Sequence, residues 1–154
     1  MIAVPQAAVG LAKRFEGFHR VPKNDPGRAY PYVCPAGYWT IGWGHLCQPD
    51  HPPVTEAEAE GYLARDLITA LNATLRFCPV LATEPEGRLA AIVDFTFNLG
   101  AGRLQTSTLR RRINQRDWQL AGLELGRWIY GGGKALPGLT ERRKQETQIF
   151  LVAL

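Results

Sequence analysis

The sequence predicts an α+β protein, with a small β-containing lobe and a larger helical lobe joined by a long helix. Three observations predict this arrangement. Apolar residues recur at helical spacing near the start, β-forming residues and glycines dominate residues 29–48, and helical periodicity with capping signals returns from residue 55 onward. Two such lobes leave a natural cleft between them. With 154 residues, the chain is expected to form a single domain, residues 1–154.

The first helix is expected over residues 5–18, because its large apolar residues repeat at helical spacing. Gly17 predicts that this helix ends near Glu16, since glycine is the usual residue just beyond a helix C-terminus. The acid is therefore expected at the end of the helix.

An irregular stretch follows. Residues 21–28 contain prolines, a glycine and an Asn-Asp pair, which predict a loop. Residues 29–48 favour short strands and turns, with the tightest break at residues 35–37. The proline-rich residues 49–53 are expected to be a linker.

The rest of the chain is predicted to be helical. Thr55 and Glu58 form a capping box, in which each side chain bonds the other's backbone N–H. The helix that they begin is expected to run from Glu56 to about Phe77, and Pro79 ends it. Further helices are expected at residues 86–99, from Ser107 or Thr108 to Asn114, at residues 116–130, and from Thr140 to the C-terminus.

Composition and charge narrow the classes of function. A net charge of +4 and a pI near 9.2 give a mild preference for anionic partners, among them bacterial wall polymer. The basic clusters 110–112 and 142–144 come without zinc-ligand or RNA-binding signatures, so we expect no nucleic-acid partner. No apolar run approaches the roughly 20 residues that cross a bilayer, and no cleavable signal peptide is expected.

Three cysteines, Cys34, Cys47 and Cys78, exclude a fully paired disulfide framework. No CxxC pair is present, so we expect no metal site. Cys47 and Cys78 lie near prolines at segment ends and are candidates for a disulfide in an oxidising compartment. Cys34 would then be the free thiol.

Two short motifs hold the candidate chemistry. In the first, Glu16 stands between Phe15 and Phe18; apolar surroundings favour the protonated form of a carboxyl, as a general acid requires. The alternative for Glu16 is a surface glutamate at a helix end. The second motif is Tyr-Trp-Thr-Ile-Gly-Trp-Gly-His at residues 38–45, which suits a strand that turns tightly with its backbone open to a ligand.

Four segments resemble the phage-type lysozymes, a glycoside hydrolase family of phage endolysins. They are residues 15–18, 34–45, 95–100 with 107–109, and 127–133. The resemblance implies a lysozyme-like fold and a muramidase that hydrolyses the β-1,4 bond between N-acetylmuramic acid and N-acetylglucosamine in peptidoglycan. It implies no cofactor.

In that family a catalytic Glu is followed by an Asp or Cys and then by a Thr six positions later. The resemblance implies that Glu16 protonates the glycosidic oxygen, while Cys34 and Thr40 hold the nucleophilic water on the opposite side. Cys34 is alternatively a thiolate nucleophile, or a small buried apolar residue. The family usually places its second residue nine positions after the Glu, where this chain has Asp25. Because Pro31 stands where the matching Thr would be, we favour Cys34 and infer an insertion in the intervening loop.

The resemblance also suggests a structural role for His45, as the partner of an acid early in the long helix, which Asp66 fits. Four further positions resemble sites that contact the sugar chain, although each is equally compatible with a core or capping role: Phe97, Asn98, Thr108 and Tyr130.

The expected partner is the peptidoglycan glycan strand. We expect a monomer that is made in the host cytoplasm and acts on the wall in the periplasm after a separate protein permeabilises the membrane. The basic C-terminal helix is a candidate for contact with an anionic outer membrane. The alternative functions are a wall-binding module without catalysis and a membrane-active basic protein.

Overall fold

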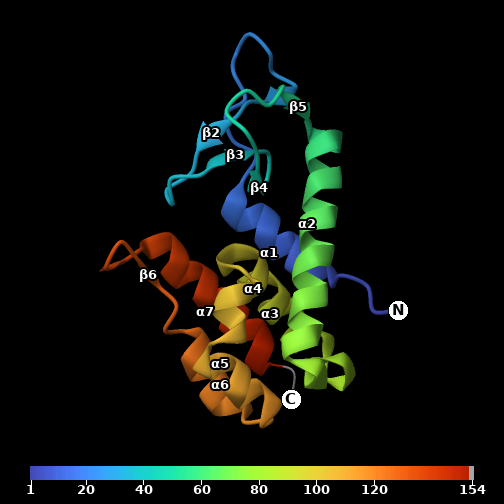
Figure 1. Ribbon diagram of the computed structural model, residues 1–154, viewed down its shortest axis with the longest axis vertical. Coiled ribbons are helices and arrows are strands. Elements are labelled where there is room, and N and C mark those ends of the chain that lie inside the picture. Colours follow the sequence, from blue (N-terminus) through green and yellow to red (C-terminus); the bar gives the residue numbers. More distant parts are fainter. Residues whose placement is uncertain (153–154) are drawn as a thin grey trace. The chain divides into compact units, whose positions relative to one another are not determined.

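The computed structural model describes residues 1–152, and the chain divides into two compact units. The β unit comprises residues 12–66, and the helical unit comprises residues 1–11 together with the chain from Leu67 onward. Helices α1 (Gln6–Glu16) and α2 (Glu56–Phe77) contribute residues to both units (Figure 1). The predicted α+β class, with a long helix shared by a strand-containing and a helical part, is confirmed.

Short antiparallel strands build the β unit. β2 (Tyr32–Val33), β3 (Trp39–Ile41) and β4 (His45–Leu46) form a three-stranded sheet in that order, and β1 (Arg28–Ala29) pairs with β5 (Val54–Thr55). The register of the sheet places Thr40 opposite Tyr32 on one side and Leu46 on the other. The strands expected within residues 29–48 are confirmed, as is the irregular loop before them.

Helix α1 ends at Glu16, as the sequence predicts. The next residue, Gly17, has φ of +68°, and its N–H donates to the Lys13 carbonyl at 3.0 Å. This is the left-handed C-cap that glycine adopts without steric cost. The cap fixes the direction in which the chain leaves the helix, and therefore the position of Glu16 at its last turn.

The capping box that begins α2 is confirmed. The Glu58 N–H donates to Thr55 Oγ1 at 3.2 Å, and the Thr55 N–H donates to Glu58 Oε2 at 3.0 Å. The helix then runs 22 residues to Phe77, the predicted end. Leu63, Leu67 and Leu71 form a buried stripe along it.

Helix α3 (Glu86–Leu99) is the core of the helical unit, since every residue from 88 to 96 is buried. It packs chiefly against α7 (Pro137–Leu151). Between α2 and α7 the chain also forms a 3₁₀ helix, η1 (Pro79–Thr83), and the helices α4 (Ala101–Gln105), α5 (Thr108–Asn114) and α6 (Trp118–Leu125). Of the two candidate caps for α5, the structure uses Ser107, whose Oγ accepts from the Arg110 N–H at 3.0 Å.

The prediction of one helix over residues 116–130 is wrong in its second half. Asp117 caps α6, which stops at Leu125. The chain then forms a hairpin of β6 (Tyr130–Gly131) and β7 (Lys134–Ala135). Gly132 and Gly133 have φ of +58° and +78°, which suits the tight turn of a hairpin and not a helix.

The expected start of the last helix at Thr140 is also wrong. Helix α7 begins at Pro137, where a missing backbone N–H costs nothing. Thr140 lies inside the first turn, and its hydroxyl donates to the Leu136 carbonyl at 3.1 Å.

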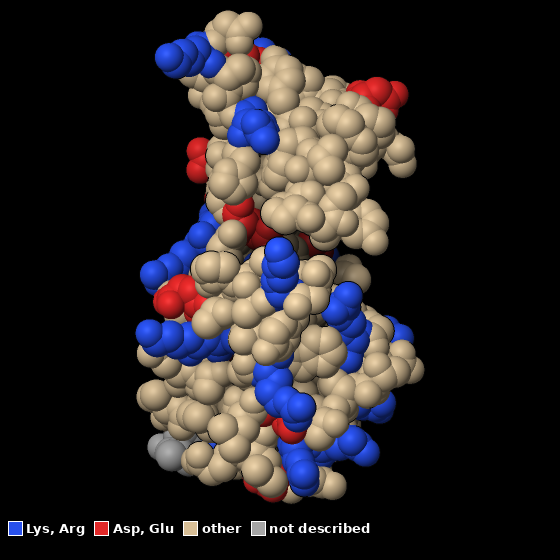
Figure 2. Space-filling model, turned by 90° about the vertical axis from the view of Figure 1, so that its left-hand side faces the viewer, with Lys and Arg blue, Asp and Glu red and all other residues tan. Residues whose placement is uncertain are grey.

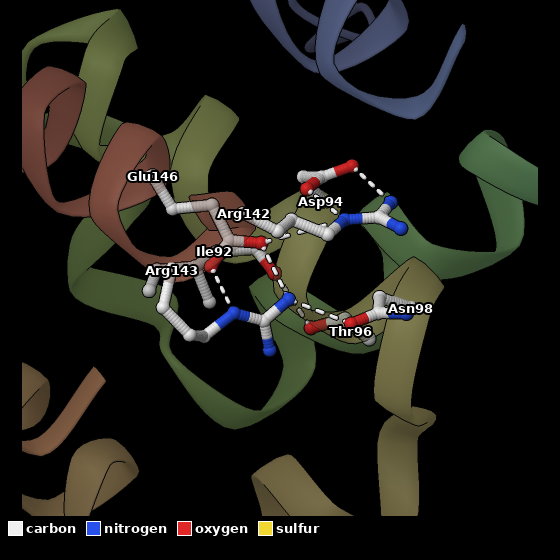
Figure 3. Close-up of polar contacts among 7 residues, drawn as sticks. All are labelled: Ile92, Asp94, Thr96, Asn98, Arg142, Arg143 and Glu146. Carbon is white, nitrogen blue, oxygen red and sulfur yellow. Dashed lines mark hydrogen bonds and ion pairs between the residues drawn. The ribbon is translucent and has the colours of Figure 1, made fainter. Parts of the chain in front are cut away.

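A buried polar cluster ties α7 to α3 (Figure 3). Arg142 donates to both oxygens of Asp94, from Nε at 2.8 Å and from Nη2 at 2.7 Å. Arg143 Nη2 donates to Glu146 Oε1 at 2.9 Å and to Asn98 Oδ1 at 2.6 Å. Burial raises the pKa of the Glu146 carboxyl well above its usual value, against the opposing attraction of Arg143. Because these charges are removed from water, their mutual pairing is what makes their burial tolerable.

Candidate active site

Glu16 is half-buried at the end of α1, and Gly44 makes room for its carboxyl group. A Cβ on Gly44 would lie 2.9 Å from Glu16 Oε2 and 3.0 Å from its Cδ. Gly44 also has φ of +79°, a conformation that other residues rarely adopt. Gly44, the second glycine of the segment 38–45, is therefore required both for the turn and for the space that Glu16 occupies.

The first glycine of that segment, Gly42, serves the packing of the sheet on α2. It has φ of +61°, and an added Cβ would lie 2.8 Å from the Cβ of Ala59. The glycine pair thus sets the strand close against α2 at one point and close against Glu16 at the next.

Cys34 lies at the start of the turn that joins β2 to β3. Its N–H donates to the Tyr38 carbonyl at 2.9 Å, and the Gly37 N–H donates to the Cys34 carbonyl at 2.8 Å. Partial burial by itself would raise the pKa of the Cys34 thiol. Hydrogen bonds from the backbone at residues 36–38 and from the Thr40 side chain outweigh burial, so the pKa is lowered. The turn and the strand together favour a thiolate.

Thr40 is buried in β3, with 2% of its surface exposed. Its hydroxyl donates to the Tyr38 carbonyl at 3.0 Å, and its interaction with the Cys34 thiol lowers the pKa of that thiol. A hydroxyl has one proton and two acceptor sites, so Thr40 serves either the sulfur or the carbonyl as donor and still accepts from a third group. The predicted juxtaposition of Cys34 and Thr40 is therefore present in the structure.

Tyr32 is a further residue of this part of the β unit, and the sequence analysis did not single it out. Its pKa is raised by burial first, and then by the negative charges of Glu16 and Cys34. Tyr32 lies opposite Thr40 in the sheet and lines the same hollow as Cys34. No motif marks Tyr32; only the strand register, which the sequence leaves open, places it there.

Asp25, the alternative to Cys34, is engaged elsewhere. The Tyr30 hydroxyl donates to Asp25 Oδ2 at 2.8 Å, and Arg28 Nε lies 3.3 Å from Asp25 Oδ1. The hydrogen bond to Asp25 raises the pKa of Tyr30. These contacts tie Asp25, inside the loop, to the residues that directly follow it, which is a structural role.

His45 has the partner that the resemblance suggested. Its Nδ1 lies 2.8 Å from Asp66 Oδ2, and its ring stacks on Tyr62 with centroids 4.3 Å apart. The expected pairing with an acid early in α2 is confirmed.

The sequence was compared with protein families and with known relatives. The phage lysozyme family model matches residues 13–146. The chain belongs to the phage lysozyme family. It is 39% identical over 127 residues to the SAR-endolysin of Bacteriophage PS119, covering 80% of this chain and 74% of that protein. It is 34% identical over 150 residues to the endolysin of Bacillus phage B103, covering 96% of this chain but only 54% of that relative. The chain thus spans about half the length of the B103 protein.

Solved structures confirm the predicted lysozyme-like fold. The active form of the P1 phage endolysin Lyz matches with a TM-score of 0.81 and 22% identity, over 98% of this chain and 86% of the other. The muramidase domain of SpmX from Asticaccaulis excentricus matches with a TM-score of 0.79 and 26% identity, over 98% and 99%.

The four candidate glycan-contact residues of this phage lysozyme all belong to the helical unit. Asn98 accepts a hydrogen bond from Arg143, and the Phe97 ring lies 5.9 Å from the Arg142 guanidinium. Thr108 is the first residue of α5, where its hydroxyl accepts from Arg111 at 3.0 Å. Tyr130 is 63% exposed on β6.

Cys47 and Cys78, the candidates for a disulfide in an oxidising compartment, are both free thiols in the structure. Cys78 is fully buried, and burial raises its pKa to about 12. Burial also raises the pKa of Cys47, so Cys34 is the thiol with the greatest thiolate character. Within residues 1–152, no group of three or more His, Cys, Asp and Glu side chains could hold a metal ion.

Proposed function

We propose that this phage lysozyme is an endolysin muramidase, which hydrolyses the β-1,4 bond between N-acetylmuramic acid and N-acetylglucosamine in peptidoglycan. The observation that carries the proposal is the placement of Glu16 against Gly44, beside a sheet whose Cys34 and Thr40 form a thiol–hydroxyl pair. The names of the relatives, which are endolysins, and of the SpmX muramidase domain support it.

The proposed chemistry assigns one role to each group. Glu16 donates its proton to the glycosidic oxygen as the bond to the sugar carbon breaks. Thr40 and Cys34 hold a water, whose oxygen bonds to that carbon and whose proton passes to the sulfur. A lowered thiol pKa favours this step, because a thiolate accepts a proton where a thiol does not. The engagement of Asp25 with Tyr30 and Arg28 supports Cys34 as the second catalytic residue.

We further propose that Phe97, Asn98, Thr108 and Tyr130 contact the sugar chain and that residues 1–154 form one catalytic domain. The exposure of Tyr130 and the fixed orientation of Asn98 support the first point. The span of the family match, residues 13–146, supports the second.

We propose that the protein is made in the host cytoplasm and acts as a monomer on the wall in the periplasm. Helices of residues 1–152 include none long and apolar enough to cross a membrane. Lys and Arg side chains are spread over the helical unit on the face shown in Figure 2, which suits an anionic polymer. In α7, however, Arg142 and Arg143 are buried in ion pairs. Any contact of α7 with an outer membrane therefore rests on residues other than these two, which counts against a membrane-active basic helix.

The test is Glu16→Gln, with Glu60→Gln as the control. Both substitutions remove one carboxylate of the β unit, but Glu60 is exposed and pairs with Lys13. We expect Glu16→Gln to reduce the clearing of chloroform-treated Gram-negative cells by roughly 10²–10⁴-fold, the usual contribution of a general acid, with an unchanged melting temperature. Glu60→Gln should clear at the wild-type rate. New reducing ends of muramic acid would identify a muramidase, whereas anhydro ends would identify a lytic transglycosylase.

Three results would contradict the proposal. Near-wild-type clearing by Glu16→Gln would remove Glu16 as the acid, and killing without new sugar ends would favour membrane action. A wild-type protein that binds peptidoglycan but releases no sugar ends would be a binding module.

A further inference from the structure

An open hollow of about 520 Å³ lies beside Cys34 in the β unit. Its lining residues are His19, Arg20, Tyr32, Val33, Cys34 and Pro35. Two of these, His19 and Arg20, come from the segment between Glu16 and the first strand, to which the proposed catalytic roles assign nothing. The hollow therefore adjoins the catalytic sulfur but is bounded on one side by basic side chains.

His19 forms part of the lining of the hollow. Its ring folds back over Gly17, where an added Cβ would lie 2.7 Å from His19 Nε2. The ring meets Tyr32 edge-on, with centroids 5.8 Å apart. Gly17 thus serves both the end of α1 and the placement of the imidazole.

The backbone of Arg20 is fixed by a hydrogen bond, while the N–H donors of its guanidinium group are available to a ligand. Its carbonyl accepts from the Tyr30 N–H at 3.0 Å, and its φ is +61°. The guanidinium carbon lies 5.9 Å from the centre of the Tyr32 ring. For the residues that the structure describes, no hydrogen bond or ion pair engages the side chains of His19, Arg20 or Tyr32. A planar fork of N–H donors above an aromatic ring, next to a phenol and an imidazole, suits a carboxylate.

We propose that this hollow binds a carboxylate of the peptide branch that muramic acid carries, with the Arg20 guanidinium as the main donor. The inference rests on the proposed function, because it concerns the substrate beside the same catalytic sulfur. Unmodified sugar rings carry no negative charge, so the peptide branch supplies the anion that the basic side of the hollow fits. Removing the peptide with an amidase leaves only the shorter lactyl carboxylate, which separates the two sources of the anion.

The experiment compares Arg20→Gln with wild type on two substrates, peptide-bearing glycan strands and the same strands after amidase treatment. The control is Arg14→Gln, which removes one exposed positive charge of the β unit outside the hollow. Glutamine has a Cβ like arginine, so the backbone strain at φ of +61° is the same in the variant.

We expect Arg20→Gln to lower kcat/KM on peptide-bearing strands about tenfold, mainly through KM, and to change it less than twofold on amidase-treated strands. Arg14→Gln should change both by less than twofold. The pH profile should be unchanged in Arg20→Gln, because burial, the backbone at residues 36–38 and Thr40 account for the Cys34 pKa, and Arg20 does not contribute.

An equal loss on both substrates, a loss that Arg14→Gln shares, or a shifted pH profile would overturn the inference. Equal activity of Arg20→Gln and wild type on both would do the same. If wild type itself released no sugar ends from either substrate, the proposed function would fail instead, which keeps the two failures distinct.

Discussion

Gly44→Ala tests the contact between the glycine-rich segment, residues 38–45, and Glu16, the proposed catalytic acid. The added methyl group would lie 2.9 Å from Glu16 Oε2 and 3.2 Å from its Cγ. Contacts of this kind relax at about 3.5 Å, so the Glu16 side chain must retreat by roughly 0.5–1 Å. The carboxyl is the flexible end of a side chain, and we therefore expect it to move while the sheet stays in place.

The structure gives separate magnitudes for stability and activity. An alanine at φ of +79° costs about 1–2 kcal/mol of backbone strain. For a chain of this size, that lowers the melting temperature by roughly 2–8 °C. A displacement of about 1 Å at a catalytic group costs on the order of 10²-fold in rate, so we expect a loss of about 10–100-fold in wall clearing.

Gly133→Ala is the matched control. Gly133 has φ of +78°, and nothing lies within 4 Å of an added Cβ, so the strain is the same without the contact to Glu16. Thermal unfolding and turbidity clearing, measured at a temperature where both variants are folded, separate the two effects. Equal residual activity in the two variants would refute the role of Gly44 in placing Glu16.

Two further predictions concern the thiol and the buried cluster. Limiting iodoacetamide near neutral pH should label Cys34 before Cys47 and Cys78, because burial raises the pKa values of those two thiols. Thr40→Val should shift the pH profile of Cys34 labelling to higher pH, because the Thr40 hydroxyl lowers the pKa of the Cys34 thiol. Mass spectrometry of the labelled peptides measures both effects, and an unshifted profile would contradict this role of the hydroxyl. Asp94→Ala should lower the free energy of unfolding, measured with denaturant, by about 3–5 kcal/mol, because it removes the bidentate partner of the buried Arg142. The control Glu124→Ala breaks an exposed ion pair and should lower it by less than about 1 kcal/mol. Similar losses of stability in the two variants would show that the buried ion pair stabilises the fold no more than the exposed one does.

Much of the helical structure was predictable because its signals are local. The Thr55–Glu58 capping box and the glycine after Glu16 act within one helical turn, and the structure forms both as expected. The hairpin at residues 130–135 was missed because an apolar segment that precedes three glycines fits the end of a helix as well as a strand. The start of α7 was misplaced because a threonine is a good cap but also a tolerated residue inside a first turn, where it bonds the preceding carbonyl.

The class of fold and the family could be predicted from the sequence, because they depend on helical periodicity and on short motifs such as residues 38–45. The resemblance also led to the proposal of Glu16, Cys34 and Thr40 for catalysis, although Cys34 does not stand at the family's usual interval from the Glu. Tertiary structure decided what surrounds those residues. The strand register places Tyr32 opposite Thr40, and the turn after β3 brings Gly44 next to Glu16. The fold at the end of the loop pairs Asp25 with Tyr30. Each of these contacts depends on how the chain folds back on itself, which local sequence preferences do not specify. For the same reason, only the structure shows Arg20 beside Cys34, with donors that no described residue engages.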